Sequence, residues 1–370
     1  MEAAICFFIG TEAELIKLFP VIQGVRQRGL PFRIIASGQN DLNNSQVMLR
    51  ALGMKPDIEL SKESDIRKSA AGLLQWYGKT WRLARRELPA YLTGIDLPRS
   101  VMVVHGDTVS TLMGAWLGRR MGMRVAHVEA GLRSHNWLNP FPEEIDRVLT
   151  SRKADVHFAP GAEPMKNLAG RTGVVNTEYN TIIDSLAFSR SIPCKDQKVN
   201  DLMGRDYFVL VFHRQENLMK KELVRQIAAR AKALAAQRCC VFILHKPTEV
   251  ALQEMGLLQD LLETPNLVAL PRVEYFDFMK LLDAAQFVIT DGGSNQEELS
   301  YMGKPCIILR THTERQDGLG ENALLYGGDL AKLDDFVAHY EEYRRPAVIP
   351  ERSPSGIISE KLARMLTEQA

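Results

Sequence analysis

The feature that most constrains the fold is a short apolar run that ends abruptly in polar or acidic residues and then recurs along the chain. Between Val101 and Arg147, the runs 101–104 and 125–128 both end this way, and residues 109–123 between them fit a crossover helix. Buried parallel strands are apolar along their length and deliver polar side chains at their carboxyl ends. The stretch therefore predicts a strand–helix–strand unit of an α/β protein with an open parallel sheet.

Three acidic residues, Asp107, Glu129 and Glu143, stand at the ends of predicted strands or loops in this stretch. Because open α/β sheets bind ligands beyond the carboxyl ends of their strands, we expect the three carboxylates to converge at one crevice. Carboxylates that share a cleft raise one another's pKa, which suits proton transfer at neutral pH. Any one of them could instead cap a helix or pair with an arginine, but the three together favour acid–base chemistry. Three further side chains are expected nearby: His105, His127 and Arg133.

Length and composition indicate a two-domain cytoplasmic protein. A chain of 370 residues exceeds the usual size of a single core. The net charge of +1 gives no argument for nucleic acid or for an anionic membrane. The apolar run 5–9 is too short for a signal peptide, and no run reaches the length of a membrane span. The cysteines fit no zinc pattern, so we expect reduced packing residues and no metal: Cys6, Cys194, Cys239, Cys240 and Cys306.

A second set of strand–helix units follows a change of pattern between residues 176 and 205, where a polar, proline-bearing run at 191–198 predicts the domain hinge. Residues 41–62 are expected to be irregular. Helices are predicted over 70–92, 147–153 and 359–369, and the aromatic residues of the first of these helices are expected to belong to the core. They are Trp76, Tyr77 and Trp81.

Two further segments could bind an anion. Gly292 and Gly293 follow a predicted strand and begin a helix whose free amides suit phosphate, while Glu297 and Glu298 could accept hydrogen bonds from ribose. The same pattern also fits an ordinary helix start with favourable dipole charges. Near the N-terminus, Gly10-Thr11 opens a helix that carries Lys17 within reach of the same kind of anion. His213, at a strand end, is a candidate ligand or acid, and a satisfied loop histidine is the alternative.

Eight segments in order resemble the UDP-N-acetylglucosamine 2-epimerase family, and specifically the non-hydrolysing branch that keeps UDP on its product. Each segment alone is a weak signal, but eight in register over almost the whole chain are specific. The segments are 10–20, 105–108, 127–133, 142–147, 180–184, 213–216, 296–298 with 303–305, and 313–315.

The resemblance implies two Rossmann-like domains facing a central cleft, as in GT-B glycosyltransferases. The domains would comprise residues 1–180, completed by a C-terminal helix at 352–370, and residues 181–351, and the protein would be a homodimer. It also implies elimination of UDP across C1 and C2 of a UDP-2-acetamido sugar to give a 2-acetamidoglucal, followed by re-addition. No redox cofactor is required.

Residue roles also follow from the resemblance. Asp107, Glu129 and Glu143 would be the acid–base carboxylates, and His213 would hold or protonate the departing diphosphate. Phe278 would lie along the uracil, Lys17 would contact phosphate, and the glycine-rich helix start with its glutamate would hold phosphate and ribose. The implied substrate-binding set is Lys17, Arg147, Phe278, Gly292, Gly293, Ser294 and Glu298.

The chain departs from the family pattern in three places. Glu12-Ala13 stands where Arg-Pro is usual, and a glutamate there would repel the diphosphate. Gly-Gly-Ser at 292–294 replaces Ser-Gly-Gly, and the loop after Gly38-Gln39 lacks the His-Arg-Glu of members with an allosteric site. The alternatives are a hydrolysing 2-epimerase, a GT-B glycosyltransferase, or a non-catalytic nucleotide-sugar binder. The intact carboxylates favour an active enzyme.

Overall fold

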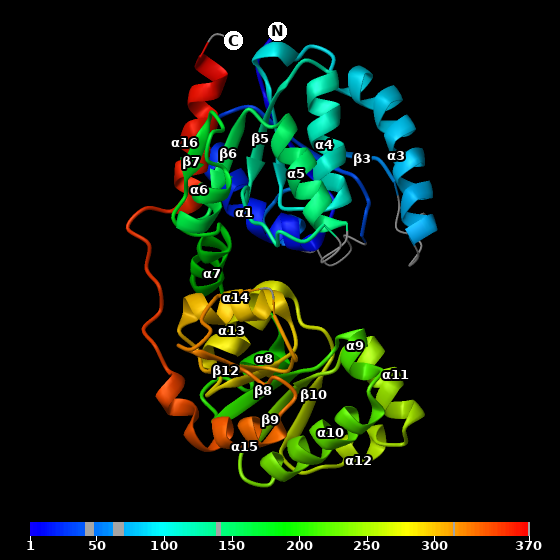
Figure 1. Ribbon diagram of the computed structural model, residues 1–370, viewed down its shortest axis with the longest axis vertical. Coiled ribbons are helices and arrows are strands. Elements are labelled where there is room, and N and C mark those ends of the chain that lie inside the picture. The colour runs from blue at the N-terminus through cyan, green and yellow to red at the C-terminus, as the bar shows by residue number, and fades with distance from the viewer. Residues whose placement is uncertain (41–47, 62–69, 138–141, 314, 369–370) are drawn as a thin grey trace. The chain divides into compact units, whose positions relative to one another are not determined.

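The chain divides into two compact units, each built around a parallel sheet (Figure 1). The computed structural model describes residues 1–40, 48–61, 70–137, 142–313 and 315–368. Unit 1 comprises residues 1–185 with 350–370, and unit 2 comprises residues 186–349.

Unit 1 alternates strands and helices, and its strands pair in the order β3-β2-β1-β4-β5-β6-β7, all of them parallel. Its elements are β1 (Ile5–Ile9), α1 (Glu12–Gln27), β2 (Phe32–Ala36), β3 (Ile58–Glu59), α3 (Ala70–Tyr91), η2 (Leu97–Arg99), β4 (Val101–His105), α4 (Val109–Arg120), β5 (Arg124–Val128), α5 (Glu143–Lys153), β6 (Val156–Ala159), α6 (Ala162–Asn167), β7 (Val174–Asn176), α7 (Ile182–Ser191, which runs on into unit 2) and α16 (Pro354–Thr367).

Helices cover both faces of this sheet, which is why its central strands are apolar on both sides. On one face, α4 approaches so closely that a Cβ on Gly114 would lie 2.8 Å from the ring of Phe8. Trp76 of α3 is buried in the core of that face, and Tyr77 stacks on Trp81 at 6.2 Å between ring centroids. The expected core role of these aromatic residues is confirmed.

The last helix, α16, packs against α1 and completes the other face of unit 1 (Figure 1). A Cβ on Gly24 of α1 would lie 2.8 Å from Oγ of Ser359, so the two helices are in close contact. The backbone N–H and the hydroxyl of Ser355 both donate to Asp184 Oδ2, at 2.8 and 2.6 Å. Hydrogen bonds and close packing therefore both attach α16 to unit 1.

Unit 2 repeats the architecture with the strand order β10-β9-β8-β11-β12-β13, again all parallel. Its elements are α8 (Gln197–Asn200), β8 (Tyr207–Val211), α9 (Gln215–Leu218), α10 (Lys221–Ala235), β9 (Cys239–Ile243), α11 (Lys246–Glu254), α12 (Leu258–Leu262), β10 (Leu267–Leu270), α13 (Tyr275–Ala284), β11 (Val288–Thr290), α14 (Gly293–Met302), β12 (Cys306–Ile308), β13 (Ala323–Leu325), α15 (Leu330–His339) and η3 (Tyr340–Tyr343).

One large apolar cluster joins α10, α11, α12 and α15 to the sheet of unit 2. At its centre Phe208 and Phe287 stack at 5.0 Å between ring centroids. Cys240 and Cys306 are buried on strands, and every cysteine is a free thiol, as expected for packing residues.

Both sheets have a topological switch point, where the strand order reverses its direction. It lies between β1 and β4 in unit 1 and between β8 and β11 in unit 2. Doubly wound sheets bind ligands beyond the carboxyl ends of the strands at such a point. The predicted α/β class with two Rossmann-like units is confirmed, and the loops that follow these four strands are the places to look for a site.

One expectation about local structure was wrong, and two predicted helices begin earlier than expected. Residues 41–62 are not irregular throughout, because Ile58 pairs with Ile35 to form β3; residues 41–47 and 62 lie outside the described residues. Helix α5 begins at Glu143 rather than at residue 147, since acidic side chains suit its first turn. Helix α16 spans Pro354–Thr367 rather than 359–369, because Ser353 caps it and a proline fits its first position.

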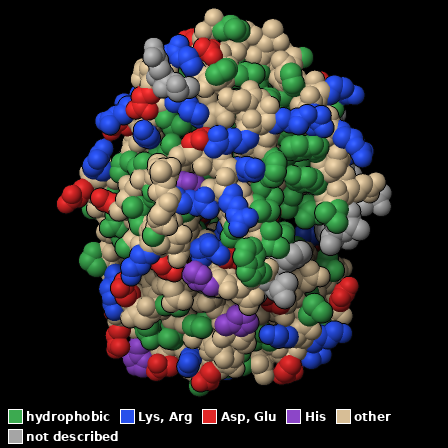
Figure 2. Space-filling model, turned by 45° about the horizontal axis from the view of Figure 1, so that its top comes forward, with side chains coloured by type: hydrophobic (Ala, Val, Ile, Leu, Met, Phe, Trp, Pro, Cys, Tyr) green, Lys and Arg blue, Asp and Glu red, His purple; other side chains and the backbone are tan. Residues whose placement is uncertain are grey.

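The visible surface is mixed in charge. Basic and acidic side chains are interspersed with apolar ones on the face seen in Figure 2, in keeping with the net charge of +1. Within the described residues, no helix combines the length and the apolar character that crossing a membrane would need.

Two glycines of unit 2 allow a matched test of the fold. Gly303 and Gly204 both have positive φ, but a Cβ on Gly303 would lie 2.1 Å from the Arg345 carbonyl oxygen, whereas one on Gly204 would meet nothing within 4 Å. Gly204→Ala should lose about 1–2 kcal/mol of unfolding free energy through backbone strain alone. Gly303→Ala should lose a further 1–3 kcal/mol or so through the clash. Equal urea-unfolding midpoints for the two variants would contradict this account.

Candidate active site

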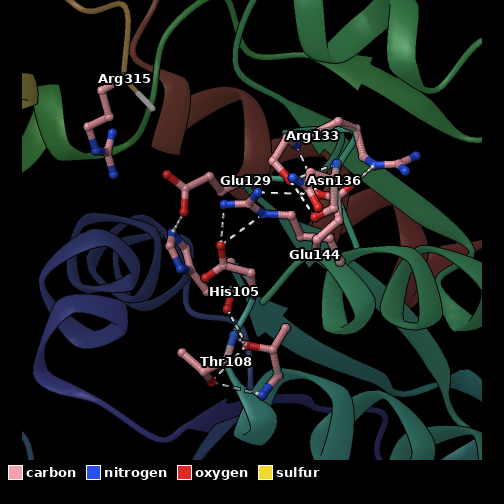
Figure 3. A network of polar contacts seen from close by, with 12 residues as sticks. His105, Thr108, Glu129, Arg133, Asn136, Glu144 and Arg315 are labelled. Atoms are coloured by element: carbon pink, nitrogen blue, oxygen red, sulfur yellow. Dashed lines mark hydrogen bonds and ion pairs between the residues drawn. The ribbon is translucent and has the colours of Figure 1, made fainter. Parts of the chain in front are cut away.

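Glu129 follows β5 in unit 1 and is surrounded by groups that can hold a carboxylate in place (Figure 3). Lys17 Nζ lies 2.5 Å from Glu129 Oε1, and Asn180 Nδ2 donates to the same oxygen. His105 Nε2 lies 3.6 Å from the other oxygen, Oε2. The Glu129 side chain is only 9% exposed, so these contacts act in a setting poor in water. The first two contacts favour the ionised carboxylate.

The backbone of Glu129 is itself unusual. Its φ is +61°, in the left-handed region that residues other than glycine rarely adopt. Gly131, two residues later, also has positive φ, and a Cβ there would lie 2.5 Å from the Pro164 carbonyl oxygen. Such strain costs on the order of 1–3 kcal/mol and persists where the surrounding structure imposes it, most often at functional sites. The tight turn after β5 therefore aims the Glu129 carboxylate.

Asp107 follows β4 and is the first of a series of acidic and basic side chains that alternate and pair with one another. Arg147 Nη2 lies 2.6 Å from Asp107 Oδ2, and Arg147 Nη1 lies 3.4 Å from Glu144 Oε2. The buried Glu144 carboxylate also accepts from Arg133 Nε at 2.6 Å and from the Ser134 N–H at 2.9 Å (Figure 3). Burial opposes ionisation of Glu144, but the Ser134 N–H and the Arg133 guanidinium outweigh it and hold its pKa below the usual value. Glu144 thus fixes Arg147 next to Asp107.

Asp146, on the first turns of α5, is a carboxyl in a very different environment. Its side chain is 5% exposed, and its Oδ2 accepts no hydrogen bond from any described residue. Glu143 lies one helical turn earlier, and its buried Oε2 has no such partner within the described residues either. Burial, together with the charges of Asp107 and Glu143, raises the pKa of Asp146 to about 7. Asp146 therefore changes protonation state close to neutral pH.

Glu14 of α1 joins the two loops at the switch point of unit 1. Its Oε2 accepts from the Gly10 N–H at 2.7 Å, and its Oε1 accepts from the Thr108 hydroxyl at 2.5 Å. Burial raises the pKa of Glu14 to about 7 although both hydrogen bonds favour its ionised form. Glu14 thereby connects the loop after β1 to the loop that carries Asp107.

Three buried histidines lie on neighbouring strands beside this site. Burial lowers the pKa of His105 to about 3 and those of His127 and His157 to about 4, so all three are neutral at pH 7. His127 Nε2 lies 2.7 Å from the Gly106 carbonyl oxygen, to which the neutral ring donates. None of these histidines is therefore an acid at neutral pH, and His127 contacts the loop after β4.

In unit 2 the switch point is occupied by His213 and Asp291, which follow β8 and β11. His213 Nδ1 lies 3.1 Å from Asp291 Oδ1, and the same carboxylate accepts from the backbone N–H groups of His213 and Arg214. Burial disfavours ionisation of Asp291, but these donors outweigh it and lower its pKa. The ring of His245 stacks on His213 at 4.7 Å, and burial together with His213 lowers the pKa of His245 to about 4. His213 is thereby held in one orientation.

The start of α14 has the features of an anion site. Gly292 is its N-cap and donates its N–H to Thr290 Oγ1 at 3.0 Å, whereas Gly293, the first residue of the helix, has a backbone amide that no intrahelical bond uses. Arg214 Nη2 and Arg315 Nε lie 3.5 and 3.7 Å from the position that a Cβ on Gly293 would occupy. Arg315 Nη1 also pairs with Glu297 Oε2 at 2.9 Å. Amides and two guanidiniums at one point suit a phosphate group.

Three further predicted residues of unit 2 lie on α13 and α14. Ser294 is exposed in the first turn of α14, and Phe278 is half-buried on α13. Glu298 Oε2 accepts from Asn295 Nδ2 at 3.0 Å. The carboxylate of Glu298 adds to burial in raising the pKa of Tyr275 well above 10.

The structure thus pairs Lys17 with Glu129 and Arg147 with Asp107, and the charges of Asp107 and Glu143 both raise the pKa of Asp146. Of the three neighbours expected near the carboxylates, His105 faces Glu129, whereas His127 binds a backbone carbonyl and Arg133 binds Glu144. Four residues were missed: Glu14, Glu144, Asp146 and Asp291. The spacing of Asp146, one turn after Glu143, was a signal that could have found it.

The described residues contain no group of three or more His, Cys, Asp or Glu side chains that could hold a metal ion.

Comparison with known proteins gives a consistent match. A sequence model of the UDP-N-acetylglucosamine 2-epimerase family matches residues 24–332. A UDP-N-acetylglucosamine 2-epimerase of Methanocaldococcus jannaschii is 30% identical over 97% of each chain. One from Methanococcus maripaludis is 28% identical over 86% of each chain. A crystal structure of a M. jannaschii UDP-GlcNAc 2-epimerase in complex with UDP-GlcNAc and UDP aligns with a TM-score of 0.74 at 28% identity, over 99% of both chains. The expected GT-B-like fold class is confirmed.

The raised pKa of Asp146 predicts how stability depends on pH. The folded protein keeps a proton on Asp146 up to a pKa of about 7, whereas the unfolded chain releases it near 3.8. Stability should therefore fall as pH rises from about 4 to 7. Asp146→Asn cannot ionise, so at pH 8 it should be more stable than wild type by roughly 4 kcal/mol, and near pH 4 the two should be similar. Urea unfolding at both pH values measures this.

A control of opposite sign lies on the same helix. The pKa of Glu144 is lowered, so its charge should stabilise the fold above about pH 4.5, and that contribution should disappear as pH falls below this value. Glu144→Gln should therefore be less stable than wild type at pH 8. If both variants lose stability at pH 8, the assignment of the Asp146 carboxyl is wrong.

Proposed function

The chain belongs to the UDP-N-acetylglucosamine 2-epimerase family, and from that premise we propose that it inverts C2 of a UDP-2-acetamido sugar and keeps UDP on the product. The proposed reaction converts UDP-N-acetylglucosamine into UDP-N-acetylmannosamine, or acts on a close relative of that pair. The names of the M. jannaschii and M. maripaludis relatives support the substrate class.

The proposed reaction has two steps. In the first, a base removes the C2 proton while the bond from C1 to the diphosphate breaks, so UDP leaves with the bonding electrons and a 2-acetamidoglucal forms. In the second, UDP adds back to C1 while an acid protonates the opposite face of C2. The C2 proton is only weakly acidic, so the elimination depends on stabilising the departing UDP anion with donors and cations.

The proton transfers are assigned to unit 1. The observation that carries the proposal is the Glu129 carboxylate, aimed by a left-handed turn and held by Lys17, with Asp107 at the end of the neighbouring strand. Asp107, Glu129 and Glu143 are proposed as the acid–base carboxylates. Lys17 and Arg147 are cations next to two of them and are proposed to contact the substrate, Lys17 at its phosphate.

Binding of the uridine diphosphate is assigned to unit 2. The amide of Gly293 and the exposed Ser294 are proposed to bind phosphate at the start of α14, where two guanidiniums also lie. Gly292, whose N–H donates to Thr290 Oγ1, is proposed to let the backbone approach the phosphate closely. Glu298 is proposed to accept from ribose and Phe278 to lie along the uracil. His213, oriented by Asp291, is proposed to hold or protonate the diphosphate as it leaves.

Proton NMR of the protein with UDP-N-acetylglucosamine in deuterated water tests the proposal directly. We expect deuterium at C2 and new signals of UDP-N-acetylmannosamine. Free UDP together with free N-acetylmannosamine would contradict the retaining reaction and indicate the hydrolysing one. Unchanged spectra for this sugar and for related UDP-2-acetamido sugars would contradict an epimerase altogether.

Glu129→Gln tests the carboxylate that carries the proposal. It keeps the shape of the side chain but removes the ionisable carboxyl, so kcat should fall about 100-fold or more. Glu178 is a matched control, because it is an exposed glutamate of unit 1 that also has positive φ. Glu178→Gln should keep wild-type kcat in the same NMR assay. A Glu129→Gln enzyme with wild-type activity would remove Glu129 from the mechanism.

A further inference from the structure

The proposed reaction poses a problem of proton supply. One group takes the C2 proton from one face of the sugar, and another gives a proton to the opposite face. After each turnover, one carboxyl therefore holds a proton that it must lose, and another lacks a proton that it needs. Before the next turnover in the same direction, a proton must pass between these groups or be exchanged with water.

Asp146 is a buried carboxyl whose protonation is affected by the charges of both Asp107 and Glu143. It lies on the same helix as Glu143, one turn later, and its charge is coupled to those of both Asp107 and Glu143. It is 95% buried, and its Oδ2 accepts no hydrogen bond from any described residue. Glu143 Oε2, buried on the same helix, also accepts no hydrogen bond from any described residue. An unpartnered buried carboxyl oxygen is costly, so its presence calls for a reason.

The groups around Asp146 do not neutralise it. Arg147 is directed to Asp107 and Glu144, and His127 on β5 is neutral. Tyr77 on α3 keeps its proton, because burial and Asp146 both raise its pKa. Among the described residues, the charged and titratable groups in or next to the first turns of α5 include Asp107, Glu143, Glu144, Arg147, His127 and Tyr77.

We propose that Asp146 is a positioning residue that acts through Asp107 and Glu143, accepting the proton that one of them has gained and supplying the proton that the other has lost. This inference rests on the proposed function. In each transfer one O–H bond breaks and another forms, so the carboxyl that gives the proton becomes a carboxylate and the total charge of the three groups is unchanged. A carboxyl that titrates near neutral pH can act in both directions.

The test compares Asp146→Asn with Thr150→Val. Asparagine keeps the shape of the side chain but cannot exchange a proton. Thr150 lies one turn further along α5, is fully buried, and its Oγ1 has no hydrogen-bond partner within the described residues, so it is a matched site without an ionisable group. The rate of epimerisation of UDP-N-acetylglucosamine is measured by NMR from pH 5 to 9 for wild type and both variants.

We expect wild-type kcat to depend on a group that titrates near pH 7, and we expect Asp146→Asn to lose that dependence. At pH 7.5 its kcat should fall about tenfold or more, while KM changes less than about threefold. Thr150→Val should keep the wild-type pH profile. Since Asp146→Asn is expected to be more stable at this pH, lower activity cannot be ascribed to unfolding. If it does not fold, Asp146→Ser serves as a second non-ionisable variant.

The outcomes separate this inference from the proposed function. If wild type is active and Asp146→Asn keeps its pH profile and kcat, only the role of Asp146 is overturned. The same holds if Thr150→Val loses activity in the same way. If wild type leaves the sugar nucleotide unchanged at every pH, the proposed function fails, and the inference fails with it.

Discussion

The parallel pairing of β1 with β4, and of β8 with β11, is the constraint on which the candidate site depends. In each unit the connections that follow these two strands lead in opposite directions along the sheet. The two loops at the carboxyl ends of the pair are therefore left uncovered by crossover helices. Glu14 and Thr108 join these loops in unit 1, and His213 and Asp291 join them in unit 2. In unit 1 the Thr108 hydroxyl donates to Glu14, and in unit 2 the His213 backbone N–H donates to Asp291, so a hydrogen-bonded pair with different chemistry lies at the switch point of each unit.

The carboxyls of unit 1 differ because their surroundings differ. Glu144 receives a guanidinium and a backbone N–H and stays ionised, which fixes the arginine beside Asp107. Asp146, two residues later, receives neither and titrates near neutral pH. A carboxyl that stays ionised and one that titrates near neutral pH are therefore separated by about half a helical turn.

Much of this could be predicted from the sequence, because apolar runs that end in polar residues are a local signal. The apolar runs that form β4 and β5 predicted a parallel sheet, and they also predicted that Asp107 and Glu129 stand at strand ends. The left-handed backbone of Glu129 could not be predicted, since strain at a residue other than glycine is imposed by tertiary packing, such as that of Gly131 against Pro164 in the same turn. Glu14 was missed because burial of a carboxyl is decided by tertiary packing, which composition and spacing do not report.

The return of α16 to unit 1 has a consequence for how the protein is made. Helix α1 leaves the ribosome early, but its partner α16 follows only after the whole of unit 2 has been translated. At about 5–20 residues per second, residues 186–349 take on the order of ten seconds or longer. During that interval the face of α1 that α16 later covers remains bare on the nascent chain, where chaperones can bind it. Unit 1 is therefore the first unit to be synthesised and the last to be completed.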